Sequence, residues 1–253
     1  VIMDEIRQQA QRVGTEMRAG EVTEVDFSKR PFRCVIDGTD EIMADTVIVA
    51  TGATARWLGL ESEKAYRGFG VSACATCDGA FFKGLDVAVI GGGDTALEEA
   101  CYLAKMCNKV YLVHRRDKFR ASQAMQDKAA KTPNIEFVMN SIPQEILGEK
   151  KGFVKRVTGL QLLNKETNEL NTIEIRGVFV AIGVTPVTDL FKGQLDLDEQ
   201  GYIITQGNRP LTNVPGVFAA GDVQDPLYRQ AITAAASGCK AAVEAERFLM
   251  ENE

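Results

Sequence analysis

The sequence is poor in histidine, in basic charge and in long apolar runs. Its 253 residues include one histidine, and 35 acidic side chains outnumber 29 basic ones, for a net charge of −6. Nucleic-acid-binding proteins usually carry a basic face, so we expect no nucleic-acid partner. A single histidine argues against a histidine-rich zinc site and against a histidine-dependent hydrolase. No apolar run approaches the roughly 18 residues of a membrane span, so we expect no membrane partner.

The cysteines lack the spacing of a disulfide framework. Only Cys74 and Cys77 form a C-x-x-C pair, and the other four are Cys34, Cys101, Cys107 and Cys239. A chain of this length can build a core without such a framework, which favours the reducing cytoplasm. The opening VIMDEIRQQA lacks the apolar stretch of a signal peptide. It also lacks Met at position 1, from which we expect that the sequence begins partway through a gene product.

Strands and helices alternate through most of the chain. Helical spacing of apolar residues predicts an amphipathic helix from Ile2 to Met17, followed by an antiparallel meander over Glu21–Phe27, Phe32–Ile36 and Ile42–Ala50. Further strands are predicted over 86–90, 110–113, 135–139, 177–182 and 216–220, helices over 94–106, 122–131 and 230–250, polar hairpins over 145–176 and a connection over 53–66. This alternation predicts an α/β fold with a mostly parallel sheet.

The order of these elements predicts two domains, one inserted in the other. Residues 57–183 hold one complete nucleotide-binding βαβ core. The flanking segments 1–56 and 184–253 each contain too few strands to close a sheet. We therefore expect the two flanks to form one second domain, which the central domain interrupts.

A glycine-rich turn follows the strand over 86–90. The segment VAVIGGGDTALEEA fits the pattern G-x-G-x-x-A with Gly91, Gly93 and Ala96. The first glycine makes a tight turn, the second lets a pyrophosphate approach the backbone, and the small third residue packs helix on strand. The alternative is a strand–helix turn without a ligand, but the flanking strands and helix favour a dinucleotide site. The predicted cofactor-binding residues of the turn are Gly91, Gly92, Gly93, Asp94, Thr95 and Ala96.

The next strand ends in basic residues where an NAD site usually carries an acid. His114, Arg115 and Arg116 follow the strand over 110–113, and Arg120 comes four residues later. Guanidinium groups bind phosphate in a fork, so these arginines favour the 2′-phosphate of NADPH. A solvated basic turn is the alternative, and Asp117 is a competing acid beyond the strand end. His114 is predicted as a structural residue or a phosphate contact.

Cys74-Ala75-Thr76-Cys77 leaves three interpretations open. A zinc site needs two more ligands, and Cys101 and Cys107 are spaced wrongly for them. The pair could also be incidental. In a redox pair at a helix start, one thiol has a lowered pKa and attacks a partner disulfide. Asp78 lies beside the second cysteine and would move the proton, so the predicted catalytic residues are Cys74, Cys77 and Asp78.

Five motifs, in order, carry a resemblance to a known family. ACATCDGAFF, VAVIGGGDTALEEA, VHRRDKFRAS, AIGVTP and GVFAAGDVQDPLYRQAITAAASG resemble the bacterial low-molecular-weight thioredoxin reductases over essentially the whole chain. The resemblance implies two Rossmann-like, three-layer nucleotide-binding domains, with an NADPH domain inserted into a FAD domain that is incomplete at its N-terminal side. The residues that it places at the flavin are Thr51, Gly52, Gly221, Asp222, Arg229, Gln230 and Ala231.

The sequence departs from this family in two places. It has no second G-x-G-x-x-G, so a first stretch of about 60 residues, the size of a βαβ unit with its crossover, is expected to be missing. Val187 stands where the family has Asn after Pro186, which predicts a weaker or altered contact.

The sequence thus predicts a disulfide reductase in which electrons pass from NADPH through FAD to Cys74–Cys77 and on to thioredoxin. The resemblance also implies a homodimer and a rotating NADPH domain, with hinges near 53–60 and 182–186. Two alternatives remain at this stage. The acceptor could differ, which would make the chain the reductase partner of a peroxidase module or a ferredoxin-like reductase. Ferredoxin-linked members of the superfamily lack the C-x-x-C, so Cys74 and Cys77 argue against the ferredoxin case. The chain could also be a truncated NADPH-binding protein without flavin activity.

Overall fold

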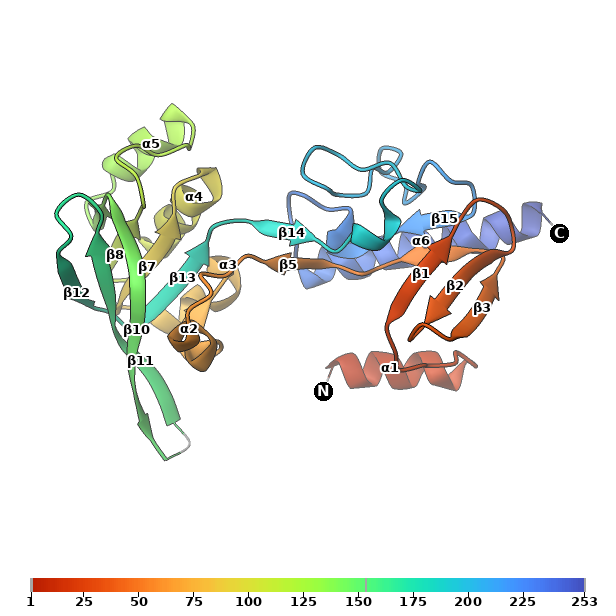
Figure 1. Cartoon of the computed structure of the whole chain (residues 1–253), viewed down its shortest axis with the longest axis horizontal. Helices are drawn as coiled ribbons and strands as arrows, with labels where there is room; N and C mark the ends of the chain where they lie inside the picture. The colour runs from red at the N-terminus through yellow and green to blue at the C-terminus, as the bar shows by residue number, and fades with distance from the viewer. Residues whose placement is uncertain (1, 153, 253) are drawn as a thin grey trace. The chain divides into compact units, whose positions relative to one another are not determined.

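The computed structural model describes residues 2–152 and 154–252, without the side chain of Lys151 (Figure 1). The chain divides into two compact units. Unit 1 combines residues 1–53 with 186–253, and unit 2 is the continuous segment 54–185. The expected boundaries at 56/57 and 183/184 lie within a few residues of this division. Each unit is built from its own sheets and has its own core.

Unit 2 is organised around a five-stranded parallel sheet. Its strand order is β6 (Val71–Ser72), β13 (Gly177–Ala181), β7 (Asp86–Gly91), β8 (Lys109–Val113) and β9 (Ile135–Val138). Successive side chains of β7 alternate between two hydrophobic clusters, Val87 and Val89 in one, Ala88 and Ile90 in the other. Both faces of the strand are therefore buried, which explains its continuous apolar run. The predicted parallel α/β core is confirmed.

Two different layers cover this sheet. The helix α4 (Asp94–Leu103) contributes Leu97 and Leu103 to the first cluster, and α5 (Gln123–Ala130) contributes Ala129. The second cluster contains Leu160 and Leu162 from an antiparallel sheet. That sheet consists of β10 (Ser141–Lys151), β11 (Val154–Asn164) and β12 (Leu170–Glu174), and it occupies the region predicted as hairpins. Unit 2 therefore has three layers (Figure 1).

Unit 1 contains a meander and a short parallel pair. The strands β1 (Val22–Asp26), β2 (Phe32–Ile36) and β3 (Asp40–Ala44) are antiparallel neighbours. The strand β4 (Val47–Val49) instead pairs in parallel with β15 (Val217–Ala219). The prediction of one strand over Ile42–Ala50 was wrong. A bend at Asp45–Thr46 separates β3 from β4, and the two strands pair with different partners. The helix α6 (Ala231–Glu251) packs Ala241 and Ala245 on Phe218 and Ala220.

Several shorter elements complete the chain. The first helix α1 (Ile2–Arg12) ends earlier than predicted and buries none of its described residues. Two connecting strands, β5 (Ala53–Ala55) and β14 (Val184–Pro186), pair with each other. Two 3₁₀ turns follow later, η2 (Asp189–Phe191) and η3 (Gly221–Val223). The helix α2 (Glu61–Tyr66) lies in the segment predicted as a connection. Its brevity hid it, since six residues show no clear helical period.

Glu63 of α2 is a fully buried carboxylate that fixes the preceding segment. It accepts hydrogen bonds from the backbone N–H of Leu58 at 2.9 Å and of Gly59 at 3.0 Å. It also pairs with the guanidinium of Arg67 at 3.2 Å, and this guanidinium lies 3.9 Å from the centre of the Trp57 ring. A buried charge with these partners holds the 57–59 segment against α2.

We expect Glu63→Ala to destabilise unit 2 by about 3 kcal/mol, because it leaves Arg67 and two backbone donors without their acceptor. Urea unfolding followed by the fluorescence of Trp57, the only tryptophan, measures the effect. Glu61→Ala is the matched control, since Glu61 is an exposed residue of the same helix that pairs with Lys64. Equal unfolding midpoints for both variants would contradict the assignment.

Candidate functional site

The C-x-x-C pair forms a disulfide at the start of a short helix. Cys74 is the N-cap of α3 (Ala75–Asp78), and its sulfur is bonded to that of Cys77. The sulfur of Cys74 also accepts the backbone N–H of Cys77 at 3.2 Å and lies 3.4 Å from the hydroxyl of Thr76. Both neighbours would stabilise a thiolate on Cys74 once the disulfide is reduced. The sequence pattern did not predict this helix, although the redox interpretation considered a pair at a helix start.

One side of the disulfide loop is buried and the other side is exposed. Ala75 is fully buried in the same hydrophobic cluster as Ala96 and Leu97, so the loop shares its core with α4. Asp78 is half-buried and ends α3. On the outer side Cys77 is exposed, and Phe81 of the following 3₁₀ turn η1 (Gly79–Phe82) is 79% exposed. The turn after the disulfide loop thus exposes an apolar residue that the sequence pattern did not single out.

The glycine turn needs its glycines for two different reasons. A Cβ on Gly91 would lie 2.4 Å from the carbonyl oxygen of Ala181 and 2.6 Å from Cβ of Ala96. A Cβ on Gly93 would meet nothing within 4 Å. Gly91 is thus required by packing between β7, β13 and α4. Gly93 stands at an open surface in front of the N-terminus of α4, where a pyrophosphate would approach.

This difference predicts two separable phenotypes. Gly91→Ala should destabilise the fold by about 2 kcal/mol, since backbone and side chains must shift to admit the methyl group. Gly93→Ala should leave the unfolding temperature unchanged and weaken NADPH binding about tenfold by holding the phosphates away. Thermal unfolding and nucleotide titration on both variants check this. Normal NADPH affinity in a folded Gly93→Ala protein would contradict the proposed approach of the ligand.

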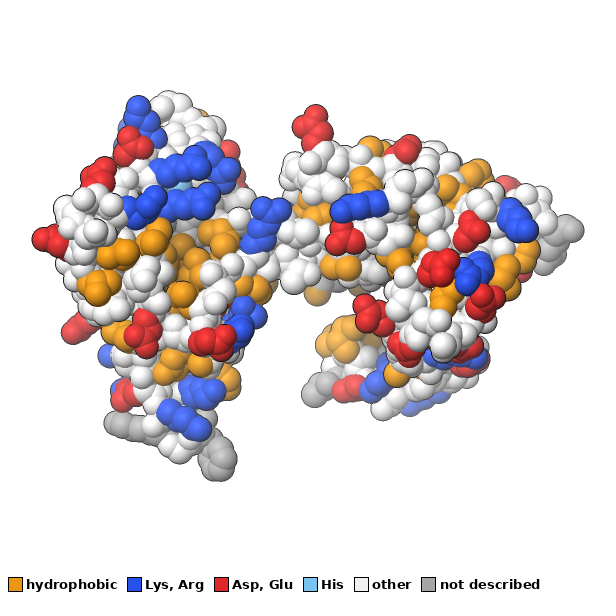
Figure 2. Space-filling view, in the orientation of Figure 1, with side chains coloured by type: hydrophobic (Ala, Val, Ile, Leu, Met, Phe, Trp, Pro, Cys, Tyr) orange, Lys and Arg blue, Asp and Glu red, His pale blue; other side chains and the backbone are white. Residues whose placement is uncertain are grey.

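The basic residues after β8 form an exposed cluster beside the glycine turn. Arg115, Arg116 and Arg120 are exposed, and none of the ion pairs found among residues 2–152 and 154–252 engages them. Figure 2 shows Lys and Arg side chains gathered around the single histidine of the molecule. The backbone N–H of Arg120 donates to the carbonyl of Gly92 at 2.7 Å. The structure thus brings the two predicted halves of the dinucleotide site together.

Two predicted cofactor residues of this site use their side chains for contacts within unit 2. His114 is only 6% exposed, and its ring nitrogens lie 3.0 Å from the carbonyl oxygens of Gly91 and Lys118. Burial is the main reason that the pKa of His114 is lowered. The carboxylate of Asp94 accepts both the N–H and the hydroxyl of Ser122, and these bonds lower its pKa. Ser122 was missed as a site residue, although the sequence placed a helix start there.

The predicted flavin residues of unit 1 lie at the carboxyl ends of its parallel pair. Thr51 and Gly52 follow β4, and Gly221 and Asp222 follow β15, so both pairs leave the same edge of the sheet. Gly52 and Gly221 have φ angles of 74° and 77°, which favour glycine. The N–H of Gly221 donates to the hydroxyl of Ser237 at 2.7 Å. This serine of α6 is a further residue that the sequence pattern did not reveal.

Asp222 and the start of α6 provide the polar groups at this edge. Burial, together with nearby Asp225, raises the pKa of Asp222. Arg229 donates to the Tyr202 hydroxyl at 3.3 Å. Gln230 forms the N-cap of α6 and begins a capping box with Thr233, and Ala231 is the first residue of the helix. A half-buried carboxylate beside free backbone donors suits the hydroxyl and phosphate groups of a nucleotide.

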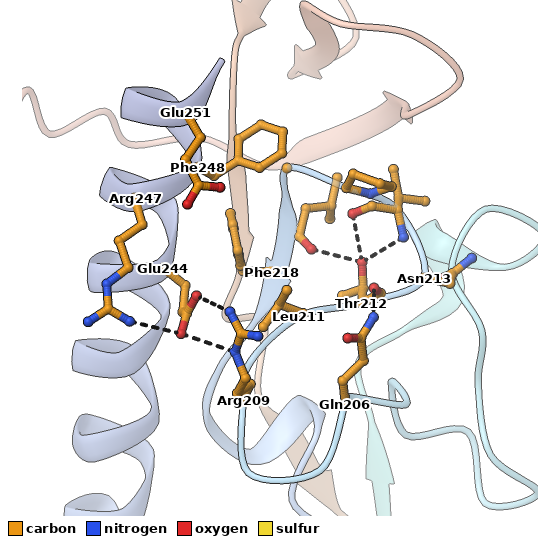
Figure 3. A pocket seen from close by; sticks show the side chains of 14 residues that line it. Gln206, Arg209, Leu211, Thr212, Asn213, Phe218, Glu244, Arg247, Phe248 and Glu251 are labelled. Atoms are coloured by element: carbon orange, nitrogen blue, oxygen red, sulfur yellow. Dashed lines mark hydrogen bonds and ion pairs between the residues drawn. The ribbon is translucent and has the colours of Figure 1, made fainter. Parts of the chain in front are cut away.

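A separate cavity of about 190 Å³ lies in unit 1 between α6 and the 206–218 segment (Figure 3). Arg209 and Arg247 both pair with Glu244, at 2.7 and 3.5 Å, beside the rings of Phe218 and Phe248. None of the predicted site residues lines this cavity. Its charges neutralise one another, and it stays outside the candidate site.

Neither a metal cluster nor a membrane-spanning helix occurs in the described residues. Across residues 2–152 and 154–252, no three His, Cys, Asp or Glu side chains gather in a group that could hold a metal ion. Within this described part of the chain, no helix has the length and apolarity to cross a membrane.

A disulfide, a dinucleotide-type turn and a basic strand end together define the class of protein. The family model described as "Pyridine nucleotide-disulphide oxidoreductase" matches residues 3–238. The chain therefore belongs to the pyridine nucleotide-disulphide oxidoreductase family. Its α/β fold with Rossmann-like units, predicted from the sequence, is confirmed by solved structures of this class.

Within the family, the similar proteins are thioredoxin reductases. The thioredoxin reductase of Rickettsia prowazekii is 52% identical over 98% of this chain and 79% of its own length. The solved structure of thioredoxin reductase from Giardia duodenalis has a TM-score of 0.90 at 46% identity, covering 98% of this chain and 80% of that one. That from Streptococcus pyogenes has a TM-score of 0.91 at 35% identity, covering 99% and 80%. The resemblance predicted from the sequence is confirmed.

Proposed function

We propose that the chain catalyses NADPH-dependent reduction of a protein disulfide, with thioredoxin as the acceptor. Written as a balanced reaction, NADPH, a proton and the acceptor disulfide give NADP⁺ and the acceptor dithiol. The Cys74–Cys77 disulfide accepts two electrons in each cycle. The resulting dithiol then passes them to the acceptor by thiol–disulfide exchange, through a transient mixed disulfide.

One observation carries this proposal. The redox pair lies in the same unit as a glycine turn and three exposed arginines that lack acidic partners among the described residues. Arginine forks bind a 2′-phosphate through charge-assisted bonds, which favours NADPH over NADH. The thiolate-stabilising N–H of Cys77 and hydroxyl of Thr76 prepare Cys74 for exchange. Half-buried Asp78, next to Cys77, is proposed to move the proton.

The residues of unit 1 fit a flavin in part. Asp222 would hold a hydroxyl of FAD. The cofactor would also contact the backbone at Thr51, Gly52, Gly221 and Gln230–Ala231. Arg229, which donates to the Tyr202 hydroxyl, would lie beside these groups. The bound flavin would supply the two-electron relay between NADPH and the disulfide. The chain spans about 79% of the length of the first of these relatives. The flavin contacts proposed for this chain are limited to the residues of unit 1 just named.

The acceptor is proposed from the rim of the disulfide loop and from the relatives' names. A protein partner must reach the disulfide loop, where Cys77 is exposed and Cys74 is half-buried, and the exposed ring of Phe81 follows in the next turn. We further infer a reducing cytoplasmic location from the cysteine usage, and a homodimer from the family resemblance alone.

The test is NADPH oxidation by the purified protein with oxidised thioredoxin or a peroxidase module as the acceptor. We expect turnover with thioredoxin and none with the peroxidase module alone. An absorbance spectrum of the same sample shows whether flavin is bound. Turnover with the peroxidase module alone would show that this module, and not thioredoxin, is the acceptor. A colourless protein that binds NADPH without turnover would contradict the proposed activity.

A further inference from the structure

The buried imidazole of His114 connects two segments that both belong to the candidate nucleotide site. One ring nitrogen lies 3.0 Å from the carbonyl oxygen of Gly91, at the end of β7, and the other lies 3.0 Å from that of Lys118. A neutral ring donates to one of these carbonyls, and a protonated ring donates to both. The backbone of Gly92 passes directly over the ring, since a Cβ there would lie 2.2 Å from its Nδ1. The ring of His114 therefore lies against the backbone of the glycine turn.

The backbone of His114 is fixed as firmly as its ring. Its N–H donates to the carbonyl of Val138 and its carbonyl accepts the N–H of Ser141, each at 2.9 Å. The ring also packs against Phe119, with centroids 5.3 Å apart, and Phe119 packs edge-on against Phe137 at 5.2 Å. The imidazole is thus held by the strand end on one side and by the basic segment on the other.

Two more links join the basic segment to the glycine turn. The N–H groups of Arg120 and Ala121 both donate to the carbonyl of Gly92, at 2.7 and 3.2 Å. The next residue, Ser122, donates its N–H at 2.9 Å and its hydroxyl at 2.7 Å to the carboxylate of Asp94. The segment from His114 to Ser122 is therefore tied to Gly91–Asp94 at three successive points. We call these three links the turn clamp.

We propose that His114 and the Asp94–Ser122 pair are positioning residues that set the preference for a 2′-phosphorylated dinucleotide. This inference rests on the proposed use of NADPH. Three exposed arginines on a free loop would lose side-chain and backbone freedom on binding a phosphate, and that loss would weaken their grip. The turn clamp removes the backbone part of this loss before the ligand arrives. His114 and Asp94 thus act through Arg115, Arg116 and Arg120, not by touching the nucleotide with their side chains.

The experiment measures the affinities of the whole chain for NADPH and NADH, with 2′,5′-ADP and 5′-AMP as competing probes. We expect His114→Ala to raise the Kd for NADPH and 2′,5′-ADP about tenfold, the effect of one or two lost hydrogen bonds. The Kd for NADH and 5′-AMP should rise less than about threefold. Ser122→Ala, which removes only a hydroxyl, should show the same selectivity with about a threefold effect.

A double-mutant cycle with Arg116→Ala separates positioning from general damage. If His114 acts through the arginines, His114→Ala should change the Kd for NADPH less in the Arg116→Ala background than in the wild type. Gln123→Ala is the matched control, since it removes a side-chain bond to Asp127 one position beyond the clamp. It should leave both affinities unchanged.

Three outcomes overturn the inference, and they differ from failure of the proposed function. Equal weakening of NADPH and NADH, or full additivity with Arg116→Ala, would make His114 a merely structural residue. If His114→Ala does not fold by circular dichroism, Ser122→Ala decides, and an unchanged NADPH-to-NADH ratio there refutes the role of the clamp. A wild-type chain without preference for NADPH would instead refute the proposed nucleotide.

Discussion

Replacing Cys77 by serine is expected to reduce disulfide-reductase turnover at least about a thousandfold, because an oxygen cannot close the reducible bond with Cys74. NADPH affinity should stay within about twofold of the wild type, since the side chain of Cys77 is exposed and supports no part of the turn. Steady-state NADPH oxidation with thioredoxin measures the first quantity, and equilibrium titration measures the second.

The chain provides its own control for this variant. Cys239 is an exposed free cysteine of α6, outside the disulfide. Cys239→Ser should therefore leave turnover unchanged. If the Cys77→Ser protein kept turnover while Cys239→Ser lost it, the redox pair would be assigned to the wrong sulfurs.

The second large effect is expected at the basic cluster. Changing Arg115 and Arg116 together to alanine should raise the Kd for NADPH by roughly 10²- to 10⁴-fold, the factor that two charge-assisted hydrogen bonds give. The Kd for NADH should change less than about threefold, because NADH has no 2′-phosphate. The loss should shrink at high salt, since screening already weakens the wild-type interaction there.

Arg156→Ala serves as a control for the loss of positive charge elsewhere in the unit. Arg156 is an exposed arginine of β11 in the same unit, and it pairs with Glu149. It removes one positive charge without touching the basic cluster. If Arg156→Ala lowered NADPH affinity as much as the double variant, the effect would reflect net charge and not a phosphate site.

Local patterns were sufficient to predict the centre of the molecule. The strand β7, the glycine turn and the start of α4 follow one another in the chain, so periodicity and turn chemistry identify them without knowledge of partners. The C-x-x-C spacing of Cys74 and Cys77, which favoured a redox pair, is equally local. The pairing of β4 with β15 is not local, because these two strands are far apart in the sequence. The break between β3 and β4 therefore escaped prediction.

Side-chain direction was the second thing that sequence could not provide. His114 belongs to a run of basic residues and was predicted as either a structural residue or a phosphate contact. Its ring lies beneath Gly92 while the arginines face solvent, which is the arrangement of a structural residue. Burial changes once, between His114 and Arg115 just after the strand end, and the sequence pattern does not reveal where this change falls. The carboxylate of Asp94 likewise faces Ser122, a partner that the spacing of the glycine motif does not reveal.

Val187, expected to weaken a contact, forms its hydrogen bonds through main-chain atoms. Its N–H donates to the carbonyl of Gly52 at 2.9 Å, and its carbonyl accepts the hydroxyl of Thr51 at 2.7 Å. Its side chain is 45% exposed. Both bonds use main-chain atoms of position 187, so they do not depend on whether that position carries Asn or Val. The altered contact to a ligand stays a prediction.

The burial of Ala75 has a kinematic consequence for the chemistry. Because this residue packs in the same hydrophobic cluster as Ala96 and Leu97, the sulfur-bearing loop shares its core with α4. We expect the loop and this helix to move together. In the proposed reaction, access of an acceptor to the sulfurs would then depend on displacement of the unit as a whole and not on motion of the loop alone.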